Sequence, residues 1–148
     1  MTDSPAACDA ALVDLLTVLE LSLLQYVSEA DPWIDAHHAE ATATLARLAK
    51  GQRRSSTETA ELLARRHLLP ELANFPSEYA QLHYLALTYI LDRLIENQQR
   101  VVTVVGSAID ACDVEESTPI LERIHDREAG HLAELQRLHE NFRTSEPG

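Results

Sequence analysis

Apolar residues recur along this chain at the three- and four-residue spacing of amphipathic helices, in four long stretches. The first runs from about Asp9 to Glu29, and the second from about Ala36 to His67. The third ends near Ala108, and the fourth runs from about Thr118 to Phe142. We take the second stretch as one continuous helix, because its apolar stripe continues beyond Gly51. The pattern predicts an all-α protein built as an antiparallel four-helix bundle.

Length and composition fit one domain. The chain has 148 residues, of which 45% are apolar, and it has few glycines (4) and prolines (6) to interrupt helices. We therefore assign residues 1–148 to a single domain. Its helical core covers about 9–142, and residues 144–148 are expected to be a disordered tail.

The charge of the chain excludes several partners. A net charge of -12 repels the phosphates of nucleic acids and the headgroups of anionic membranes, so we expect neither as a partner. The first ten residues lack the Lys or Arg of a signal peptide, and Asp14 and Glu20 interrupt the first apolar stretch. We therefore expect a cytoplasmic protein, in which Cys8 and Cys112 stay as reduced, partly buried thiols.

The connection between the second and third stretches leaves two topologies open. If the third helix begins near Ser77, the short link predicts an up-down-up-down bundle. If it begins near His83, the segment from Leu68 to Leu82 can span about 50 Å at ~3.3 Å per residue, which allows a long crossover. In the crossover arrangement Cys8 and Cys112 lie at the same end of the bundle, and in the other they lie at opposite ends.

Two acidic residues fall on apolar helix faces, where a carboxylate needs a partner. Glu20 has mostly leucine and valine neighbours one turn away on its predicted face. Glu128 lies near the centre of the inner stripe of the last helix, one turn from His131 on the same face. Glu128-Ala-Gly-His131 is therefore an inward Glu-x-x-His, whose carboxylate and imidazole can bind one metal ion together.

Other polar residues are less favoured as ligands. Gln52 and Gln98 share their faces with apolar residues and are expected to point inward, but an amide binds hard cations poorly. Glu96 shares its face with charged and polar residues, so we expect it to point outward. His125 lies one turn before Glu128 and can hydrogen-bond with it.

This set resembles the ligands of ferritin-like carboxylate proteins, in particular rubrerythrins and bacterioferritins. In that family helices one and three each supply one Glu, and helices two and four each supply a Glu-x-x-His. Glu20 and Glu128-x-x-His131 match that order and spacing, over about residues 9–142. The resemblance implies a ferritin-like bundle with a metal site at Glu20, Glu128 and His131, and assembly into homodimers or larger homo-oligomers.

The chain departs from the family pattern at two of the four positions. The second motif falls at Gln52-Arg53-Arg54-Ser55, which offers neither an acid nor a histidine. The third position offers Gln98 inward and Glu96 outward. Met1 is the only methionine, so the methionine that ligates haem in bacterioferritins is missing and no haem is expected.

Three functions follow as alternatives. The first is binding of at most one iron, manganese or zinc ion by Glu20, Glu128 and His131, between the first and last helices. The second is a metal-free scaffold or interaction protein, in which the polar residues form a buried hydrogen-bonded layer and an oligomer or partner covers the apolar outer face of the first helix. The third is a ferroxidase or peroxide-reducing di-iron protein. The missing acids argue against this third alternative, because it would need Glu96 inward and a further ligand.

Overall fold

The structure is a computed structural model that describes residues 5–30, 39–84, 86–112 and 116–145. These residues form the helices α1 (Pro5–Glu20), α2 (Leu23–Ala30), α3 (Ala39–Arg65), α4 (Leu87–Ala111) and α5 (Thr118–Ser145), with the 3₁₀ helix η2 (Ser77–Tyr84) before α4. No β-strand occurs within these ranges, so the prediction of an all-α protein is confirmed. None of these helices is both long enough and apolar enough to cross a membrane.

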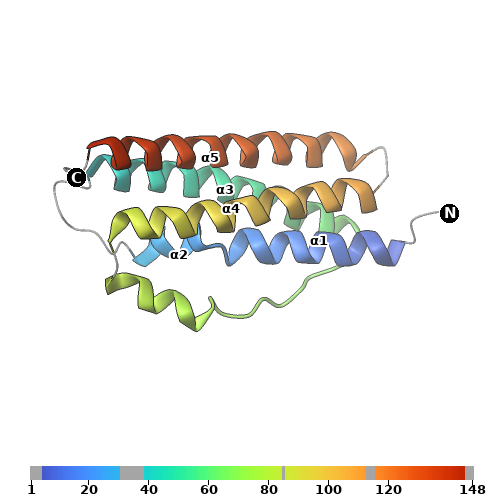
Figure 1. Cartoon of the computed structure of the whole chain (residues 1–148). Helices are drawn as coiled ribbons and strands as arrows, with labels where there is room; N and C mark the ends of the chain where they lie inside the picture. Colours follow the sequence, from blue (N-terminus) through green and yellow to red (C-terminus); the bar gives the residue numbers. More distant parts are fainter. Residues whose placement is uncertain (1–4, 31–38, 85, 113–115, 146–148) are drawn as a thin grey trace.

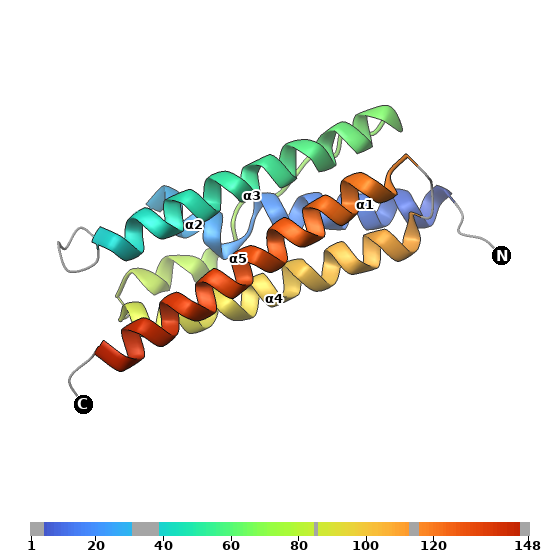
Figure 2. The same cartoon turned by 90° about the horizontal axis from the view of Figure 1, so that it is seen from above.

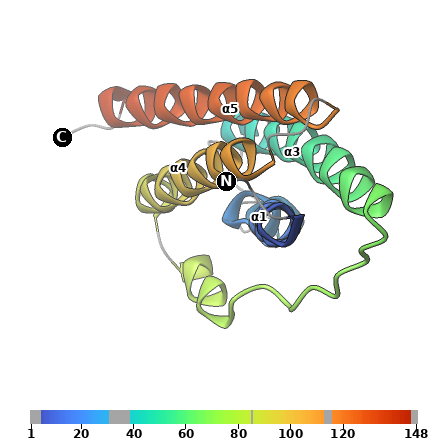
Figure 3. The same cartoon turned by 90° about the vertical axis from the view of Figure 1, so that its right-hand side faces the viewer.

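The long helices lie side by side, and α1 and α2 follow one another along a single line (Figures 1 and 2). α3 and α4 run in one direction, whereas α1 and α5 run in the opposite one (Figure 1). Residues 66–76 lead from α3 to η2 by passing back along the outside of α1 (Figures 1 and 3). The chain therefore has the long crossover, and α4 begins at Leu87, later than either start that we considered.

Most helix boundaries agree with the apolar pattern. α3 continues without a break through Gly51, as predicted, and α5 begins at Thr118 with Pro119 in its first turn. The predicted start of the second stretch at Ala36 lies outside the described residues, as do residues 146–148 of the predicted tail. Residues 144 and 145, which we assigned to that tail, belong to α5.

The first predicted helix is broken in two, which corrects our assignment of one continuous helix. α1 ends at Glu20, and α2 begins at Leu23. Ser22 caps α2, because its Oγ accepts a hydrogen bond of 3.1 Å from the backbone N–H of Gln25. The backbone N–H of Leu23, which a helix start leaves without a partner, donates to Oδ1 of Asn97 on α4 at 3.1 Å. Specific partners therefore hold the break in place.

The core consists of two apolar clusters separated by polar residues. One cluster joins α1 to the C-terminal halves of α3 and α4 and the start of α5, and the other joins α2 to the opposite halves of those helices. The buried polar residues between them, which we call the polar layer, are Ser22, Gln25, Gln52, Ser55, Gln98, Glu128 and His131. The helices α3, α4 and α5 thus each contribute to both clusters and cross the polar layer once.

The crossover covers the outer face of α1 and α2. Leu68 and Leu72 pack against the cluster that contains α1. The ring of Phe75 lies edge-on to Tyr26 of α2, with 5.4 Å between the ring centroids. This apolar face, on which we expected an oligomer or partner contact, is therefore occupied in part by the chain itself.

Cys8 and Cys112 form a disulfide, which corrects our prediction of two reduced thiols. Their Cα atoms lie 4.8 Å apart, and both side chains are buried. Cys8 lies in the first turn of α1 and Cys112 directly follows α4, so the bond joins two ends that the crossover topology brings together. Disulfides persist chiefly in oxidising environments, so this bond does not favour the cytoplasmic location that we expected.

We predict that the Cys8→Ala/Cys112→Ala variant has a free energy of unfolding about 2–4 kcal/mol lower than that of the oxidised wild type. The bond closes a loop of 104 residues, which restricts the unfolded chain. Urea denaturation measures the difference. A reductant should destabilise the wild type by a similar amount and leave the variant unchanged. Two titratable thiols in the oxidised, unfolded wild type would contradict the disulfide.

Candidate functional site

Glu128 on α5 is the centre of the polar layer. Its side chain has no exposed surface, and a buried carboxylate needs hydrogen-bond donors to be stable there. Its Oε1 accepts from Nε2 of Gln52 at 2.9 Å and from Nε2 of Gln98 at 3.0 Å. Nδ1 of His131 lies 3.3 Å from the same oxygen, and the hydroxyl of Ser55 donates to Oε2 at 2.7 Å. Polar groups from α3, α4 and α5 therefore converge on one carboxylate.

The two glutamines use all of their N–H groups inside the layer. Nε2 of Gln52 also donates to Oε1 of Gln98 at 3.1 Å, and Nε2 of Gln98 also donates to the backbone carbonyl of Glu128 at 2.9 Å. Oε1 of Gln52 accepts from the hydroxyl of Ser22 at 2.6 Å and from Nε2 of Gln25 at 3.2 Å. This network fixes the amide orientations, because turning either one would face donors with donors.

The start of α2 joins the layer through Gln25. Its Nε2 donates to the backbone carbonyl of Ala49 on α3 at 2.8 Å, and its Oε1 accepts from Nη1 of Arg53 at 3.2 Å. In a continuous first helix, Gln25 would lie on the polar side. The break at Ser22 changes the facing of α2 and leaves Gln25 only 6% exposed.

The nearest arginine reaches Glu128 through a hydroxyl. Nη1 of Arg127 donates to Oγ of Ser55 at 3.0 Å and to Oε1 of Glu58 at 2.7 Å. Arg53, the other arginine with a hydrogen bond to the layer, is exposed and reaches Gln25 only. The layer is therefore continuous with a largely buried ion pair between α3 and α5, and Ser55 is the link between them.

His131 can approach α3 because a glycine lies opposite it. His131 is only 8% exposed. A Cβ atom at Gly51 would lie 2.8 Å from Nε2 and 3.0 Å from Cε1 of the ring, which is too close. Any side chain there would displace the ring that contacts Glu128. The glycine that weakens α3 by its intrinsic propensity is thus required for the packing of α3 against α5.

The hydrogen bonds keep Glu128 ionised although it is buried. Burial raises the pKa of its carboxyl group, but the neighbouring His131 and the amides of Gln98 and Gln52 lower it by more. The net pKa therefore lies below the ordinary value of 4.5. At neutral pH the layer holds a carboxylate anion surrounded by donors.

The structure brings together some of the predicted ligands and separates others. Gln52, Gln98 and His131 point inward as predicted, and all three contact Glu128. Glu20 is exposed, so our prediction that it points inward was wrong. The reason is local: α1 ends at this residue, and the capped break that follows supplies a serine and a glutamine to the layer in its place.

Glu96 and His125, two of the less favoured ligands, lie outside the layer. Glu96 points outward, as predicted, and forms an exposed ion pair with Arg93 at 2.9 Å. His125 is not among the hydrogen-bond partners of Glu128, and it lines a surface cavity between α4 and α5. Within the described part of the chain, no three His, Cys, Asp or Glu side chains are grouped so that they could hold a metal ion. The expected three-ligand set is therefore not assembled.

The chemistry of the site follows from its donors. The two amides and the imidazole contact Oε1 of Glu128, and the hydroxyl of Ser55 contacts Oε2. A cation that entered would meet amide N–H groups, whose hydrogens carry partial positive charge, and would have to displace them. The layer is thus suited to fixing the positions of four helices relative to one another.

Part of this layer has a sequence signal that we did not use. Ser22-Leu-Leu-Gln25 is the S-x-x-Q pattern of a helix N-terminus, placed inside an apolar run. That pattern indicates both the break and the two residues that α2 contributes. The role of Arg127 has no comparable signal, because it depends on the packing of α5 against Ser55 and Glu58.

Comparisons of the chain with protein-family models, with curated proteins and with solved structures found no match. The ferritin-like resemblance accordingly stays a proposal, supported by the residues and the topology of this chain.

We predict that Glu128→Gln lowers the free energy of unfolding at neutral pH by on the order of 2 kcal/mol, because its amide has one acceptor oxygen in place of two and turns an NH2 group toward donors of the layer. The folded-state pKa of Glu128 is below its ordinary value of 4.5. Above that pH the carboxylate therefore makes its full contribution to the free energy of unfolding. Its contribution is lost as the pH falls through the folded-state pKa. The difference between wild type and variant should therefore shrink in acid, as measured by urea denaturation across pH.

The control for this variant is Glu96→Gln, which changes an exposed acid on α4. It should alter the free energy of unfolding by no more than about 0.5 kcal/mol at any pH. Glu58 and Glu134 also have lowered pKa values, so the test is the difference between the two proteins and not the acid sensitivity of the wild type alone. A difference that stays constant from neutral to acid pH would show that the charge of Glu128 contributes nothing.

Proposed function

We propose that this chain is a metal-free protein of ferritin-like architecture, which acts as a helical scaffold or interaction protein. In this proposal the polar layer around Glu128 replaces the di-metal site of the family that the chain resembles. One observation carries the proposal: Gln52 and Gln98 both donate N–H groups to the carboxylate. Acids at these two positions would instead direct carboxylate oxygens toward a shared cation.

Topology and residue placement support the ferritin-like part of the proposal. The long crossover joins the second and third long helices, α3 and α4, which is the connection that ferritin-like bundles use (Figure 1). Gln52 and Gln98 occupy the positions at which the family spacing calls for acids, and both side chains meet Glu128. The polar residues of this chain thus meet at the place where the family has its metal ligands, but amides stand there in place of acids.

The two metal-dependent alternatives have less support. The single-metal site requires Glu20, which is exposed, so only Glu128 and His131 of its three ligands lie together. The di-iron oxidase requires Glu96 to point inward, and Glu96 pairs with Arg93 on the surface. Each alternative would therefore need a rearrangement of a helix, whereas the metal-free layer is complete as it stands.

A scaffold acts through its surfaces, and the structure limits which ones are free. The crossover occupies part of the outer face of α1 and α2, through Leu68, Leu72 and Phe75. In this proposal homo-oligomer or partner contacts would therefore use the outer faces of α3, α4 and α5. The net charge of -12 favours partners with positive charge.

We predict that the wild type binds no more iron, manganese or zinc per chain than Glu128→Gln, as measured by elemental analysis after incubation with each ion. The Gln52→Glu/Gln98→Glu variant should behave differently. Without metal its clustered carboxylates repel one another and lower the melting temperature. Mn²⁺ or Zn²⁺ should then raise the melting temperature of this variant by binding the folded state, and should not raise that of the wild type.

The matched control is Gln99→Glu/Gln136→Glu, which adds the same charge at exposed positions. Its melting temperature should respond to the ions no more than that of the wild type. One ion per wild-type chain that is lost in Glu128→Gln would establish a single-metal site and overturn the proposal. Two ions per chain would instead revive the di-iron alternative.

A further inference from the structure

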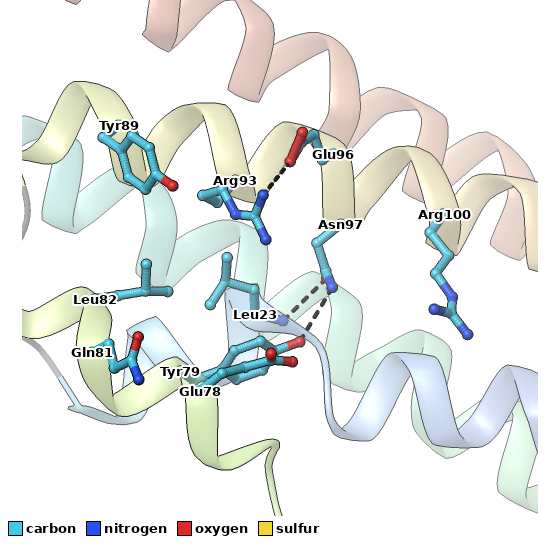
Figure 4. A pocket seen from close by; sticks show the side chains of 10 residues that line it. All are labelled: Leu23, Glu78, Tyr79, Gln81, Leu82, Tyr89, Arg93, Glu96, Asn97 and Arg100. Carbon is cyan, nitrogen blue, oxygen red and sulfur yellow. Dashed lines mark hydrogen bonds and ion pairs between the residues drawn. The ribbon is translucent and has the colours of Figure 1, made fainter.

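A cavity of about 480 Å³ lies between η2, the first half of α4 and the break between α1 and α2 (Figure 4). It is outside the polar layer and shares no residue with it. Three of its residues, Arg93, Asn97 and Arg100, are spaced four and three positions apart on α4 and therefore lie on one helix face. Figure 4 shows their side chains extending from α4 toward η2 and the helix break.

The two arginines of this cavity differ in their partners. Arg93 pairs with Glu96, but the two side chains are 53% and 61% exposed, so the pair is held weakly. Arg100 has neither an ion pair nor a hydrogen bond with any residue that the structure describes. A guanidinium group without a partner, in a chain with twice as many acids as bases, has its full set of N–H donors available.

A neutral donor stands beside these cations. The hydroxyl of Tyr79 accepts a hydrogen bond of 3.3 Å from Nδ2 of Asn97, which leaves its own hydrogen available to a ligand. Burial raises the pKa of Tyr79, so the phenol remains protonated at neutral pH. Oδ1 of Asn97 accepts from the backbone N–H of Leu23, so this wall of the cavity is anchored to the helix break.

A second cavity of about 300 Å³ adjoins the first and continues under the crossover. Tyr79, Asn97 and Arg100 line both cavities. The remaining wall of the second cavity is mostly apolar, with Val18 and Leu21 from the first helical stretch facing crossover residues. Arg100 therefore stands where a polar opening meets an apolar recess.

We propose that the two cavities form one binding site for a small amphipathic organic anion. Its charged head contacts Arg100 and the hydroxyl of Tyr79, and its apolar body lies against Val18 and Leu21 beneath the crossover. A carboxylate and a phosphate monoester share this head chemistry, because a guanidinium binds either through paired N–H groups. Glu78 and Glu96 also line the polar cavity, so it selects against heads of high negative charge such as polyphosphates.

Isothermal titration calorimetry of the full-length protein tests this site with four probes. Decanoate and decyl phosphate carry an apolar body and a charged head, decanol carries the body alone, and acetate carries a charge without the body. We expect decanoate, decyl phosphate or both to bind at least about tenfold more tightly than decanol and acetate. The preferred head then identifies the ligand as a carboxylate or a phosphate.

The decisive variant is Arg100→Gln, which removes an exposed charge without a protein partner and so should leave the fold intact. It should weaken binding of the preferred anion by about tenfold or more. Arg54→Gln, at an exposed arginine on α3, is the matched control and should leave the affinity unchanged. Circular dichroism checks that both variants are folded.

Three outcomes would overturn the proposal. They are equal affinity for decanol and decanoate, equal effects of Arg100→Gln and Arg54→Gln, and no heat of binding from either charged amphiphile at up to about 1 mM, which corresponds to a very weak site. Ser22 lines the second cavity and also belongs to the polar layer, but the test substitutes Arg100, which lies outside the layer, so it is independent of the metal-free scaffold. Metal binding by the wild type would leave its result unaffected.

Discussion

One buried carboxylate constrains the middle of this molecule. Glu128 has no exposed surface, and its ionised form is tolerated only because two neighbouring helices, α3 and α4, turn donors toward it. The side chains that donate to Glu128 also carry acceptor oxygens, and these oxygens need hydrogen-bond donors in turn. Gln52 gives both N–H groups to acceptors in the layer, and its oxygen then needs the hydroxyl of Ser22 and the amide of Gln25. Satisfying one charge in this way fixes the relative positions of α3, α4, α5 and the start of α2.

The break in the first helical stretch is a consequence of that requirement. A continuous helix would continue its leucine stripe through this region and could not present both Ser22 and Gln25 to Gln52. α1 ends at Glu20, and α2 begins at Leu23 with the capping bond from the N–H of Gln25 to Ser22. The side chains of α2 therefore face a different direction from those that a continuous helix would have there. The same break sends Glu20 to the surface, so one local event removes an expected metal ligand and supplies two hydrogen-bonding residues. The two apolar clusters on either side of the layer are formed by the segments that this break separates.

Periodicity predicted the helices and most of the polar layer. It failed where contacts between distant segments determine the position of a residue. Gln52, Gln98, Glu128 and His131 could be placed inward because each lies on a long, uninterrupted stripe. Glu20 was misplaced because the stripe of the first stretch ends at a cap that pairs with α3 and α4. The Cys8–Cys112 bond was missed for a related reason. A separation of 104 residues carries no local pattern, and the pairing follows only from the crossover that brings both ends together.

The crossover also explains why the two adjoining cavities occur beside α1 and the helix break, and how they could serve binding. A bundle helix covers its neighbours with a regular row of side chains, whereas the chain over α1 and α2 is an irregular segment followed by a 3₁₀ helix. Such a segment packs at a few points, here Leu68, Leu72 and the ring contact of Phe75 with Tyr26, and it leaves spaces between them. The arginines of α4 border the larger space, so the topology that closes the bundle also leaves positive charge beside an apolar recess. Arg100, which has no ion pair within the described part of the chain, is the cation that this recess offers to the proposed ligand.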